Sequence, residues 1–319
     1  VIDNEIEDVL NQIVANCKKN LKNDTFSKLR IAKRRTNLVI LLADFGNLFN
    51  LVEVTNSLST FAEKILELVM DLYVFNEFDR MNYISLFKNK NDYPNEICYA
   101  SLKSGLCVLG MGKLGSFELN YSSDIDLIFL FDEEKYKPEF YSKIRNVFIV
   151  IIRKIVKALS EVTAEGFVFR VDLRLRPDPS SNPICIGALV AQRYYENFGR
   201  NWERAIFIKA RAIAGDKTFG RKFLGSLTSF VWRKNLDFAA IEDINNIRKK
   251  IRKKTPRVLN TNLLGYNIKT GLGGIREIEF FAQTQQLIRG GKNKSLRENA
   301  TVNVLKQLKK TDLIIGSVE

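Results

Sequence analysis

Histidine is absent from the 319-residue sequence, and other residues with specialised chemistry are scarce. Without imidazole, any bound metal ion must be held by carboxylates, which favours Mg²⁺ or Mn²⁺ over Zn²⁺. A general base must also be something other than histidine. The four cysteines show no CxxC spacing, which argues against a zinc site or a disulfide framework and favours a reducing, cytoplasmic location.

Long hydrophobic runs are missing as well. The longest, such as residues 147–152, stop after six residues, whereas a membrane-spanning helix needs ~20 apolar residues. The first five residues are polar and acidic rather than basic and then apolar, so no signal peptide is predicted. We therefore expect no membrane partner.

The net charge is +14, from 50 basic and 36 acidic residues. This balance is compatible with a nucleic-acid partner, with an acidic or phosphate-bearing substrate, or with a lysine-rich surface. The densest basic run, residues 248–254, has six basic residues in seven but no interleaved aromatic residue on which a base could stack. We favour solvated surface for most of this charge, and a nucleic-acid partner is not favoured.

The spacing of apolar residues divides the chain into three predicted parts, in keeping with its length. Residues 1–96 show helical spacing, as in Leu38, Leu42 and Phe45, and no strand alternation. Residues 97–185 contain short apolar strands, and residues 186–319 return to helical spacing. We predict a helical N-terminal segment, a small sheet core and a helical C-terminal domain.

Individual elements follow from the same pattern and from the glycine and proline breaks. Strands are expected at residues 106–109, 124–131 and 166–176. Helices are expected at residues 140–159, 187–199, 201–214, 219–232 and 241–254, and between the glycine cluster at 271–274 and Arg289.

Residues 110–115 read Gly-Met-Gly-Lys-Leu-Gly and match G-x-G-x-x-G after a predicted strand. In a dinucleotide-binding fold, a helix and a parallel strand follow, with an acidic residue about 20 positions on. Here only residues 116–123 separate the last glycine from Asp124, and a parallel return needs about a dozen residues or more. We reject that fold and expect antiparallel strands joined by a phosphate-sized loop. The glycines alone would indicate only a tight turn.

Asp124 and Asp126 lie two residues apart in a predicted strand, so their side chains share a face. Two adjacent carboxylates at the mouth of a buried strand repel each other, and a divalent cation is the natural compensation. A solvated strand end explains one aspartate better than two. In the third predicted strand, Asp172 lies between arginines that could bind phosphate oxygens. Taken alone, that strand is equally typical of an exposed, alternately charged edge.

Together these residues resemble nucleotidyltransferases of the DNA polymerase β type, which combine a glycine turn, Asp-x-Asp on one strand and a third aspartate on a neighbouring strand. Six longer strings resemble the glutamine synthetase adenylyltransferase/adenylyl-removing enzyme family over residues 26–315. They are Gly110-Met-Gly-Lys-Leu-Gly115, Ser123-Asp-Ile-Asp-Leu127, Val171-Asp-Leu-Arg-Leu-Arg-Pro177, Trp202-Glu-Arg204, Lys209-Ala-Arg211 and Gly273-Gly-Ile-Arg-Glu-Ile-Glu-Phe280.

The resemblance implies an α+β fold with a nucleotidyltransferase core, built on a small mixed or antiparallel sheet flanked by helices. It implies that Asp124, Asp126 and Asp172 are catalytic and bind two Mg²⁺ or Mn²⁺ ions. It also implies a set of residues that bind phosphate or nucleotide, namely Gly112, Lys113, Gly115, Ser123, Arg174, Arg176, Lys209 and Arg211. We assign Trp202 to the core.

The family carries two related halves, one that removes adenylyl groups by phosphorolysis and one that adds them from ATP. Strings at residues 194–204, 274–277 and 289–291 resemble the N-terminal, adenylyl-removing half, and the sequence contains a single Asp-x-Asp module. The resemblance thus implies that phosphate releases ADP from adenylylated glutamine synthetase, with the PII signalling protein as a further partner. The alternatives are adenylylation from ATP, a nucleic-acid polymerase or tRNA nucleotidyltransferase, and an inactive interaction module.

Overall fold

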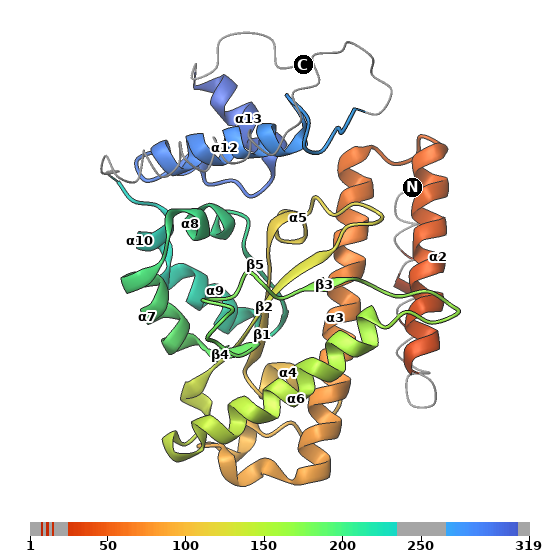
Figure 1. The fold of residues 1–319 in the computed structure, drawn as a ribbon. Coiled ribbons are helices and arrows are strands. Elements are labelled where there is room, and N and C mark those ends of the chain that lie inside the picture. Colours follow the sequence, from red (N-terminus) through yellow and green to blue (C-terminus); the bar gives the residue numbers. More distant parts are fainter. Residues whose placement is uncertain (1–7, 9–10, 13–14, 16–24, 235–265, 312–319) are drawn as a thin grey trace. The chain divides into compact units, whose positions relative to one another are not determined.

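The computed structural model describes residues 8, 11–12, 15, 25–234 and 266–311. The chain forms two compact units, the first comprising Val1–Tyr194 and Ala210–Gly225, the second Tyr195–Lys209 and Ser226–Glu319. Figure 1 shows their elements. The helix predicted at 241–254, with its basic run, lies outside the described residues. The three-part division by residue range stays a prediction.

A five-stranded mixed sheet forms the centre of the first unit, in the order β3-β2-β1-β5 with β4 also paired to β2. The predicted antiparallel pair is confirmed, with Leu106 opposite Phe131 and Gly110 opposite Leu127. β1 also pairs antiparallel with β5, whereas β3 and β4 run parallel to β2. The α+β fold with a small mixed sheet is therefore confirmed. The strands are β1 (Leu106–Gly110), β2 (Ile125–Phe131), β3 (Val171–Asp172), β4 (Cys185–Gly187) and β5 (Arg211–Gly215).

Helices surround this sheet in the first unit, and α3 and α6 pack against each other beside it (Figure 1). A capping box starts α3, because Asn50 accepts hydrogen bonds from Val52 and Glu53 while Glu53 accepts one from Asn50 N. The helices of this unit are α2 (Thr25–Phe45), α3 (Leu51–Met81), η1 (Tyr83–Leu86), η2 (Lys90–Asp92), α4 (Ala100–Lys103), α5 (Gly112–Gly115), η3 (Glu133–Lys135), η4 (Pro138–Phe140), α6 (Tyr141–Ser160) and α9 (Lys217–Ser226).

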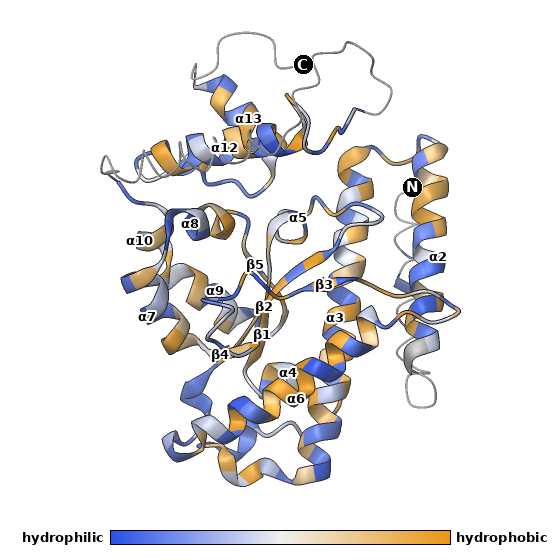
Figure 2. Ribbon diagram, in the orientation of Figure 1, coloured by the Kyte–Doolittle hydropathy of each residue, from blue (hydrophilic) through white to orange (hydrophobic). Residues whose placement is uncertain are grey.

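An aromatic cluster joins these helices to the sheet. The Phe148 ring on α6 lies 5.5 Å from that of Phe131 on β2 and 6.2 Å from that of Phe78 on α3. Each ring is buried, and burying such a side chain stabilises a fold by about 1.5–3 kcal/mol. Every residue of β1 is buried, and so is β2 except at Asp126. The apolar strands in Figure 2 are thus covered on both faces.

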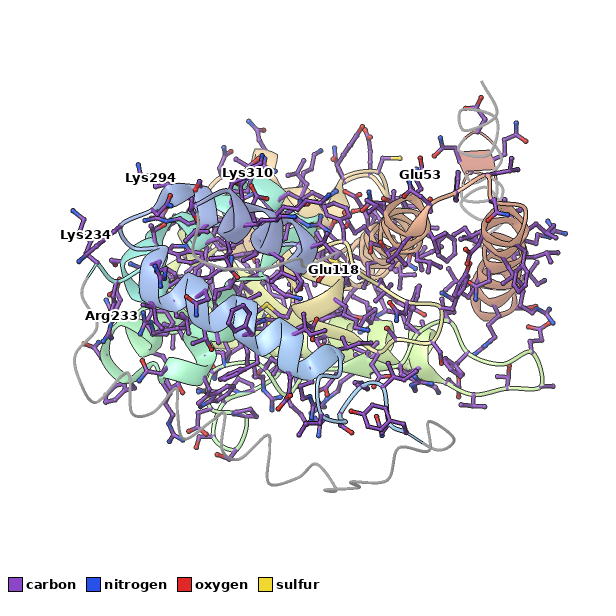
Figure 3. All side chains as sticks on the ribbon, turned by 90° about the horizontal axis from the view of Figure 1, so that it is seen from above. Glu53, Glu118, Arg233, Lys234, Lys294 and Lys310 are labelled. Carbon is purple, nitrogen blue, oxygen red and sulfur yellow. The ribbon has the colours of Figure 1, made fainter. Side chains whose placement is uncertain are left out.

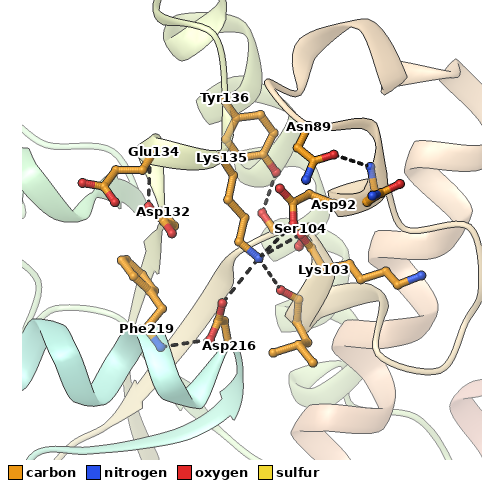
Figure 4. Close-up of polar contacts among 12 residues, drawn as sticks. Asn89, Asp92, Lys103, Ser104, Asp132, Glu134, Lys135, Tyr136, Asp216 and Phe219 are labelled. Carbon is orange, nitrogen blue, oxygen red and sulfur yellow. Dashed lines mark hydrogen bonds and ion pairs between the residues drawn. The ribbon is translucent and has the colours of Figure 1, made fainter.

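Lys135 fixes the end of the sheet that lies opposite Asp126. Its ammonium group donates to Leu102 O at 3.0 Å and Lys103 O at 3.1 Å, and lies 3.5 Å from Asp216 Oδ2 (Figure 4). These contacts join the end of β2 to the segments that precede β1 and follow β5. They fix this end of the three strands relative to one another. Asp126 lies at the opposite end, where the site described below is located.

Three sequence predictions need correction. The third strand, expected at residues 166–176, is limited to Val171–Asp172. The helix expected at residues 201–214 ends at Phe207, and β5 follows at Arg211–Gly215. The helix expected at 219–232 is divided into α9 and α10. β5 is the second hydrogen-bonded neighbour of β1. Without it, β1 would be a buried edge strand with unpaired amide groups, which explains why residues 211–215 form a strand.

The apolar residues whose spacing predicted a helix around residues 38–45 are exposed on α2 and do not face the core. Leu38, Leu42 and Phe45 on α2 are exposed, and Phe45 reaches 81%. Leu48, and Leu51 at the start of α3, are also exposed, and Figure 2 shows apolar residues on both helices. The helix itself is confirmed, but its core contacts come from other residues, including Leu29 and Ile40.

Short helices dominate the second unit. A small apolar cluster forms between α12 and α13, around Ala282, Leu296, Val304 and Leu308. Charged side chains such as Lys294 and Lys310 are exposed (Figure 3). Among the described residues of this unit, the elements are α8 (Asn201–Phe207), α10 (Thr228–Val231), α12 (Ile275–Arg289), η5 (Lys294–Leu296) and α13 (Thr301–Lys310), and α7 (Ala188–Phe198) passes from the first unit into the second. Across the described residues, none of the helices combines the length and apolarity that crossing a membrane requires.

Candidate active site

The predicted carboxylates lie at one end of the sheet. Asp126 on β2 and Asp172 on β3 are direct register partners. Asp124 lies two residues before Asp126, immediately outside the strand. The pairing between strands places Asp126 beside Asp172, and Asp124 precedes the same end of β2. The prediction that they come from two neighbouring strands is therefore confirmed for Asp126 and Asp172.

The glycine turn lies against the Asp126 carboxylate. A Cβ atom on Gly112 would lie 3.3 Å from Asp126 Oδ2, and the backbone φ of Gly112 is +53°. Met111 N also donates to Asp126 O at 2.9 Å. A side chain at this position would be both strained and crowded, so the close approach of turn and carboxylate explains the glycine. Residues 112–115 form one helical turn, α5, in place of the plain loop that was expected.

Lys113 and Ser123 are both joined to the loop that follows α5. The amide oxygen of Asn120, in its favoured orientation, lies 3.3 Å from Lys113 Nζ. Asn120 N donates to Ser123 Oγ at 3.3 Å, and Ser123 N donates back to Asn120 O at 3.2 Å. These contacts organise residues 113–123 into a compact connection between the glycine turn and the aspartates.

Arginine side chains pair with two of the three carboxylates. Arg174 donates from Nε to Asp172 Oδ1 and Oδ2 at 3.0 and 2.9 Å, and from Nη2 to Oδ2 at 2.5 Å. The side-chain hydrogen bond from Arg174 holds the pKa of Asp172 below its ordinary value. Arg170 forms an ion pair with Asp124 and donates to Ser122 O at 2.6 Å. The sequence indicated Arg170 only as one of the arginines beside Asp172 that could bind phosphate oxygens, and its pairing with Asp124 was not predicted.

The charges of Asp126 and Asp124 also act on Arg174. Its pKa is raised, first by the hydrogen bond to Asp172 and the charge of that group, and to a smaller extent by the charges of Asp126 and Asp124. Arg174 thus contacts Asp172 directly and feels only the weaker charge of Asp126 and Asp124. Its side chain is 84% exposed, so it can also reach a bound anion.

The carboxylates suit a hard divalent cation by their chemistry, because Mg²⁺ and Mn²⁺ prefer oxygen ligands. In the part of the chain that the structure describes, no three acidic or cysteine side chains gather closely enough to hold an ion. Two of the predicted carboxylates are instead paired with arginines, Asp124 with Arg170 and Asp172 with Arg174. A cation at this site would have to replace at least one arginine as the partner of a carboxylate.

Two predicted phosphate ligands have structural contacts elsewhere. Arg176 donates to three main-chain oxygens, at 2.8 Å to Leu173, 2.9 Å to Pro179 and 3.2 Å to Asn182, and so closes the loop after β3. Lys209 belongs to the second unit. Phosphate binding by either residue stays a prediction.

Lys209 is buried within the second unit and joins two of its helices. Its ammonium group donates to Glu279 Oε1 at 2.9 Å and Thr301 Oγ1 at 3.0 Å. These bonds connect the end of α8 to α12 and α13. Arg211 also has protein partners, which include the carbonyl oxygen of Gly115 at 3.0 Å.

Other strings that carried the resemblance have clear structural roles in the second unit. Arg204 is fully buried and donates to Phe230 O at 2.9 Å and Val231 O at 3.2 Å. The assignment of Trp202 to the core was wrong, because its side chain is 37% exposed. A Cβ atom on Gly290 would lie 2.6 Å from the Trp232 ring, and one on Gly291 would lie 2.0 Å from Arg233 O, so the Arg-Gly-Gly string allows close packing against residues 232–233.

Comparison with known proteins identifies the family of the chain. The family model for glutamate-ammonia ligase adenylyltransferase matches residues 3–226, which include the glycine turn and all three aspartates. A second family model, GlnD PII-uridylyltransferase, matches residues 245–317. The two matches together cover most of the chain.

Similar proteins are named bifunctional glutamine synthetase adenylyltransferase/adenylyl-removing enzyme. The chain is 43% identical to the protein of Rhizobium meliloti over 294 residues, which are 92% of this chain and 29% of that protein. It is 45% identical to the protein of Agrobacterium fabrum over 289 residues, which are 90% and 28% of the two chains. The chain thus spans less than a third of the length of these relatives.

Proposed function

Because the chain belongs to the glutamate-ammonia ligase adenylyltransferase family, we propose that it removes AMP from adenylylated glutamine synthetase by phosphorolysis. The protein substrate is taken from the names of its relatives. The observation that carries the chemistry is the register pairing of Asp126 with Asp172 beside the glycine turn at Gly112.

In the proposed reaction, an orthophosphate oxygen attacks the phosphorus of the adenylyl group, and the bond from that phosphorus to the tyrosyl oxygen breaks. The products are ADP and the free tyrosine side chain, which takes up a proton. Catalysis of this kind depends on positioning and on charge neutralisation. Asp124, Asp126 and Asp172 would hold Mg²⁺ or Mn²⁺, which when bound neutralises phosphate charge and stabilises the leaving oxygen.

The residues of the chain itself supply the rest of the proposal. Arg174 is exposed beside the three carboxylates, and its planar group can bind two oxygens of one phosphate. The turn at residues 112–115 approaches Asp126 at Gly112, so we include its main-chain N–H groups and Lys113 among the phosphate ligands. Lys209 is buried in an ion pair, so we favour Arg174 and Lys113 over Lys209 as phosphate ligands.

The absence of histidine supports removal over addition. Orthophosphate is already anionic near neutral pH and needs no base, and a phenol with a pKa of about 10 is a moderate leaving group. In the opposite direction, tyrosine must lose its proton before it attacks ATP. Adenylylation from ATP is the second candidate, because the relatives are named as bifunctional enzymes.

A direct assay tests the proposal. The purified chain, incubated with adenylylated glutamine synthetase, orthophosphate and Mg²⁺, is expected to release ADP in proportion to phosphate. Release should stop when the cation is chelated. Transfer of AMP from ATP to unmodified glutamine synthetase, with no ADP release in the first assay, would instead assign the chain to adenylylation. Extension of a polynucleotide would assign it to the polymerase class.

Two further parts of the proposal concern the setting of the enzyme. The match of residues 245–317 to a PII-uridylyltransferase model supports PII as a regulatory partner, and a change in ADP release on adding PII would test this.

Three described cysteines, Cys98, Cys107 and Cys185, carry free thiols, which supports a reducing cytoplasmic location.

A further inference from the structure

Arg211 contacts the glycine turn from the neighbouring strand. It is the first residue of β5 and the register partner of Gly110 at the end of β1. Its Nε donates to Gly115 O at 3.0 Å, and its Nη2 donates to Leu114 O at 3.1 Å. Two carbonyl oxygens at the C-terminal end of α5 therefore share one guanidinium group, a position in which positive charge is favourable.

Glu63 anchors this arginine to α3. The two side chains form an ion pair, and both are mostly buried, with 23% of Arg211 and 16% of Glu63 exposed. The hydrogen-bonded ion pair thus joins α3, β5 and the glycine turn through one side chain.

Phe117 provides the third contact. The guanidinium carbon lies 3.6 Å from the centre of the Phe117 ring, a distance typical of stacking between arginine and an aromatic ring. Phe117 has a backbone φ of +59°, a conformation that costs a residue with a side chain about 1–2 kcal/mol. The stacked arginine helps to hold this strained residue where the chain leaves α5.

A one-turn helix is too short to be stable by its own hydrogen bonds. The position of α5 beside Asp126 must therefore come from tertiary contacts. Arg211 supplies two of them, at Leu114 O and Gly115 O, and also stacks on Phe117 just after the helix. We propose that Arg211 is a positioning residue that holds the turn at Gly112–Gly115 against Asp126, with Glu63 as its anchor. Its effect on catalysis, which rests on the proposed function, passes through the turn and not through contact with phosphate.

Hydrogen–deuterium exchange tests this role without relying on turnover. Arg211→Met should speed exchange in the peptide that covers residues 110–118, with little change in the sheet. Orthophosphate should slow exchange in this peptide in the unsubstituted protein and do so less in the variant. Glu63→Gln should give an intermediate result, and Arg211→Lys a partial rescue. Arg221→Met, on the exposed side of α9, is the matched control.

Kinetics of the same variants separate positioning from general destabilisation. A turn displaced by about 1 Å can cost up to about 100-fold, so the KM for orthophosphate should rise about 10- to 100-fold in Arg211→Met while the KM for glutamine synthetase is unchanged. Unchanged exchange at residues 110–118 in both Arg211→Met and Glu63→Gln would overturn the positioning role, whatever the activity. If orthophosphate fails to slow exchange in the unsubstituted protein, the proposed phosphorolysis is wrong, and the comparison of exchange rates without phosphate still decides the role of Arg211.

Discussion

Asp126 and Asp172 stand opposite each other on neighbouring parallel strands, although 45 residues separate them in the sequence. The pairing needs only the two residues of β3, because Ile125 and Val171 form the other step of the ladder. Ile125 N also donates to Arg170 O at 2.9 Å. A very short strand is thus enough to bring the third carboxylate to the first two.

Replacing Asp126 by Asn tests the role of this pair. The variant should lose turnover, because an amide cannot serve as an anionic ligand for a divalent cation. Thermal stability should be similar or higher, since repulsion between neighbouring carboxylates is relieved. Calorimetric titration with Mn²⁺ and a thermal melt provide the two readouts, with Asp79→Asn on the exposed side of α3 as the control. Full activity in the Asp126→Asn variant would exclude a metal site at this pair.

Arg174→Ala should change two affinities in opposite directions. Removal of the guanidinium frees Asp172 for a cation, so Mn²⁺ should bind more tightly. The same change removes an exposed phosphate ligand, so the KM for orthophosphate should rise. Folding should be little affected, because the side chain is largely exposed. Arg153→Ala on α6 is the control. A fall in Mn²⁺ affinity in Arg174→Ala would contradict the competition between arginine and cation.

Gly112→Ala tests the close approach of the turn to Asp126. A residue with a Cβ at φ +53° is strained, and we expect a loss of about 1–2 kcal/mol in the free energy of unfolding. Turnover should fall further, because the turn must move away from the carboxylate. Gly225→Ala is a matched control, since a Cβ there meets no atom within 4 Å. Equal stability of the two alanine variants in urea would show that the turn tolerates a side chain.

Lys33 on α2 offers a test by pH. The side chain is buried, and its ammonium group lies 4.2 Å from the centre of the Phe169 ring. Burial lowers the pKa of Lys33 from 10.5 to about 8, which corresponds to roughly 3 kcal/mol of lost stability at neutral pH. The contact with the ring returns about 1 kcal/mol. Lys33→Met should therefore be more stable at pH 7 by about 1–2 kcal/mol.

The advantage of Lys33→Met should shrink as pH rises from about 8 to 10.5. In this range folded Lys33 is neutral while the unfolded chain still binds the proton, so the stability of the unsubstituted protein rises with pH. Urea denaturation at several pH values measures the difference, with exposed Lys88→Met as the control. A destabilised Lys33→Met at pH 7 would mean that the contact with Phe169 outweighs the cost of burying the charge.

The sequence was sufficient for the parts of the site that depend on local spacing. Continuous apolar runs identified β1 and β2, and the short connection between Gly115 and Asp124 made them antiparallel. The strand expected from Asp124 begins one residue later, at Ile125, so Asp126 lies in β2 and Asp124 lies just before it. These features are governed by a few neighbouring residues, and a pattern can therefore predict them.

Features that depend on distant partners were missed. The alanines in β5 favour a helix by propensity, but pairing with β1 makes residues 211–215 a strand. The alternating charges after Asp172 suggested a longer strand, whereas Arg176 instead closes a loop through main-chain oxygens. The partners of Lys209 lie 70 and 92 residues away, and no local spacing indicates such contacts.

Isotopically labelled orthophosphate gives the most direct test of the proposed phosphorolysis. Adenylylated glutamine synthetase is incubated with the purified chain, Mg²⁺ and ³³P-orthophosphate, and the released nucleotides are separated. Attack by phosphate on the adenylyl phosphorus predicts that the label appears in ADP, at the β-phosphorus, and that its amount equals the tyrosine residues set free. Release of unlabelled AMP, or no release while α-labelled ATP modifies the free enzyme, would contradict the account.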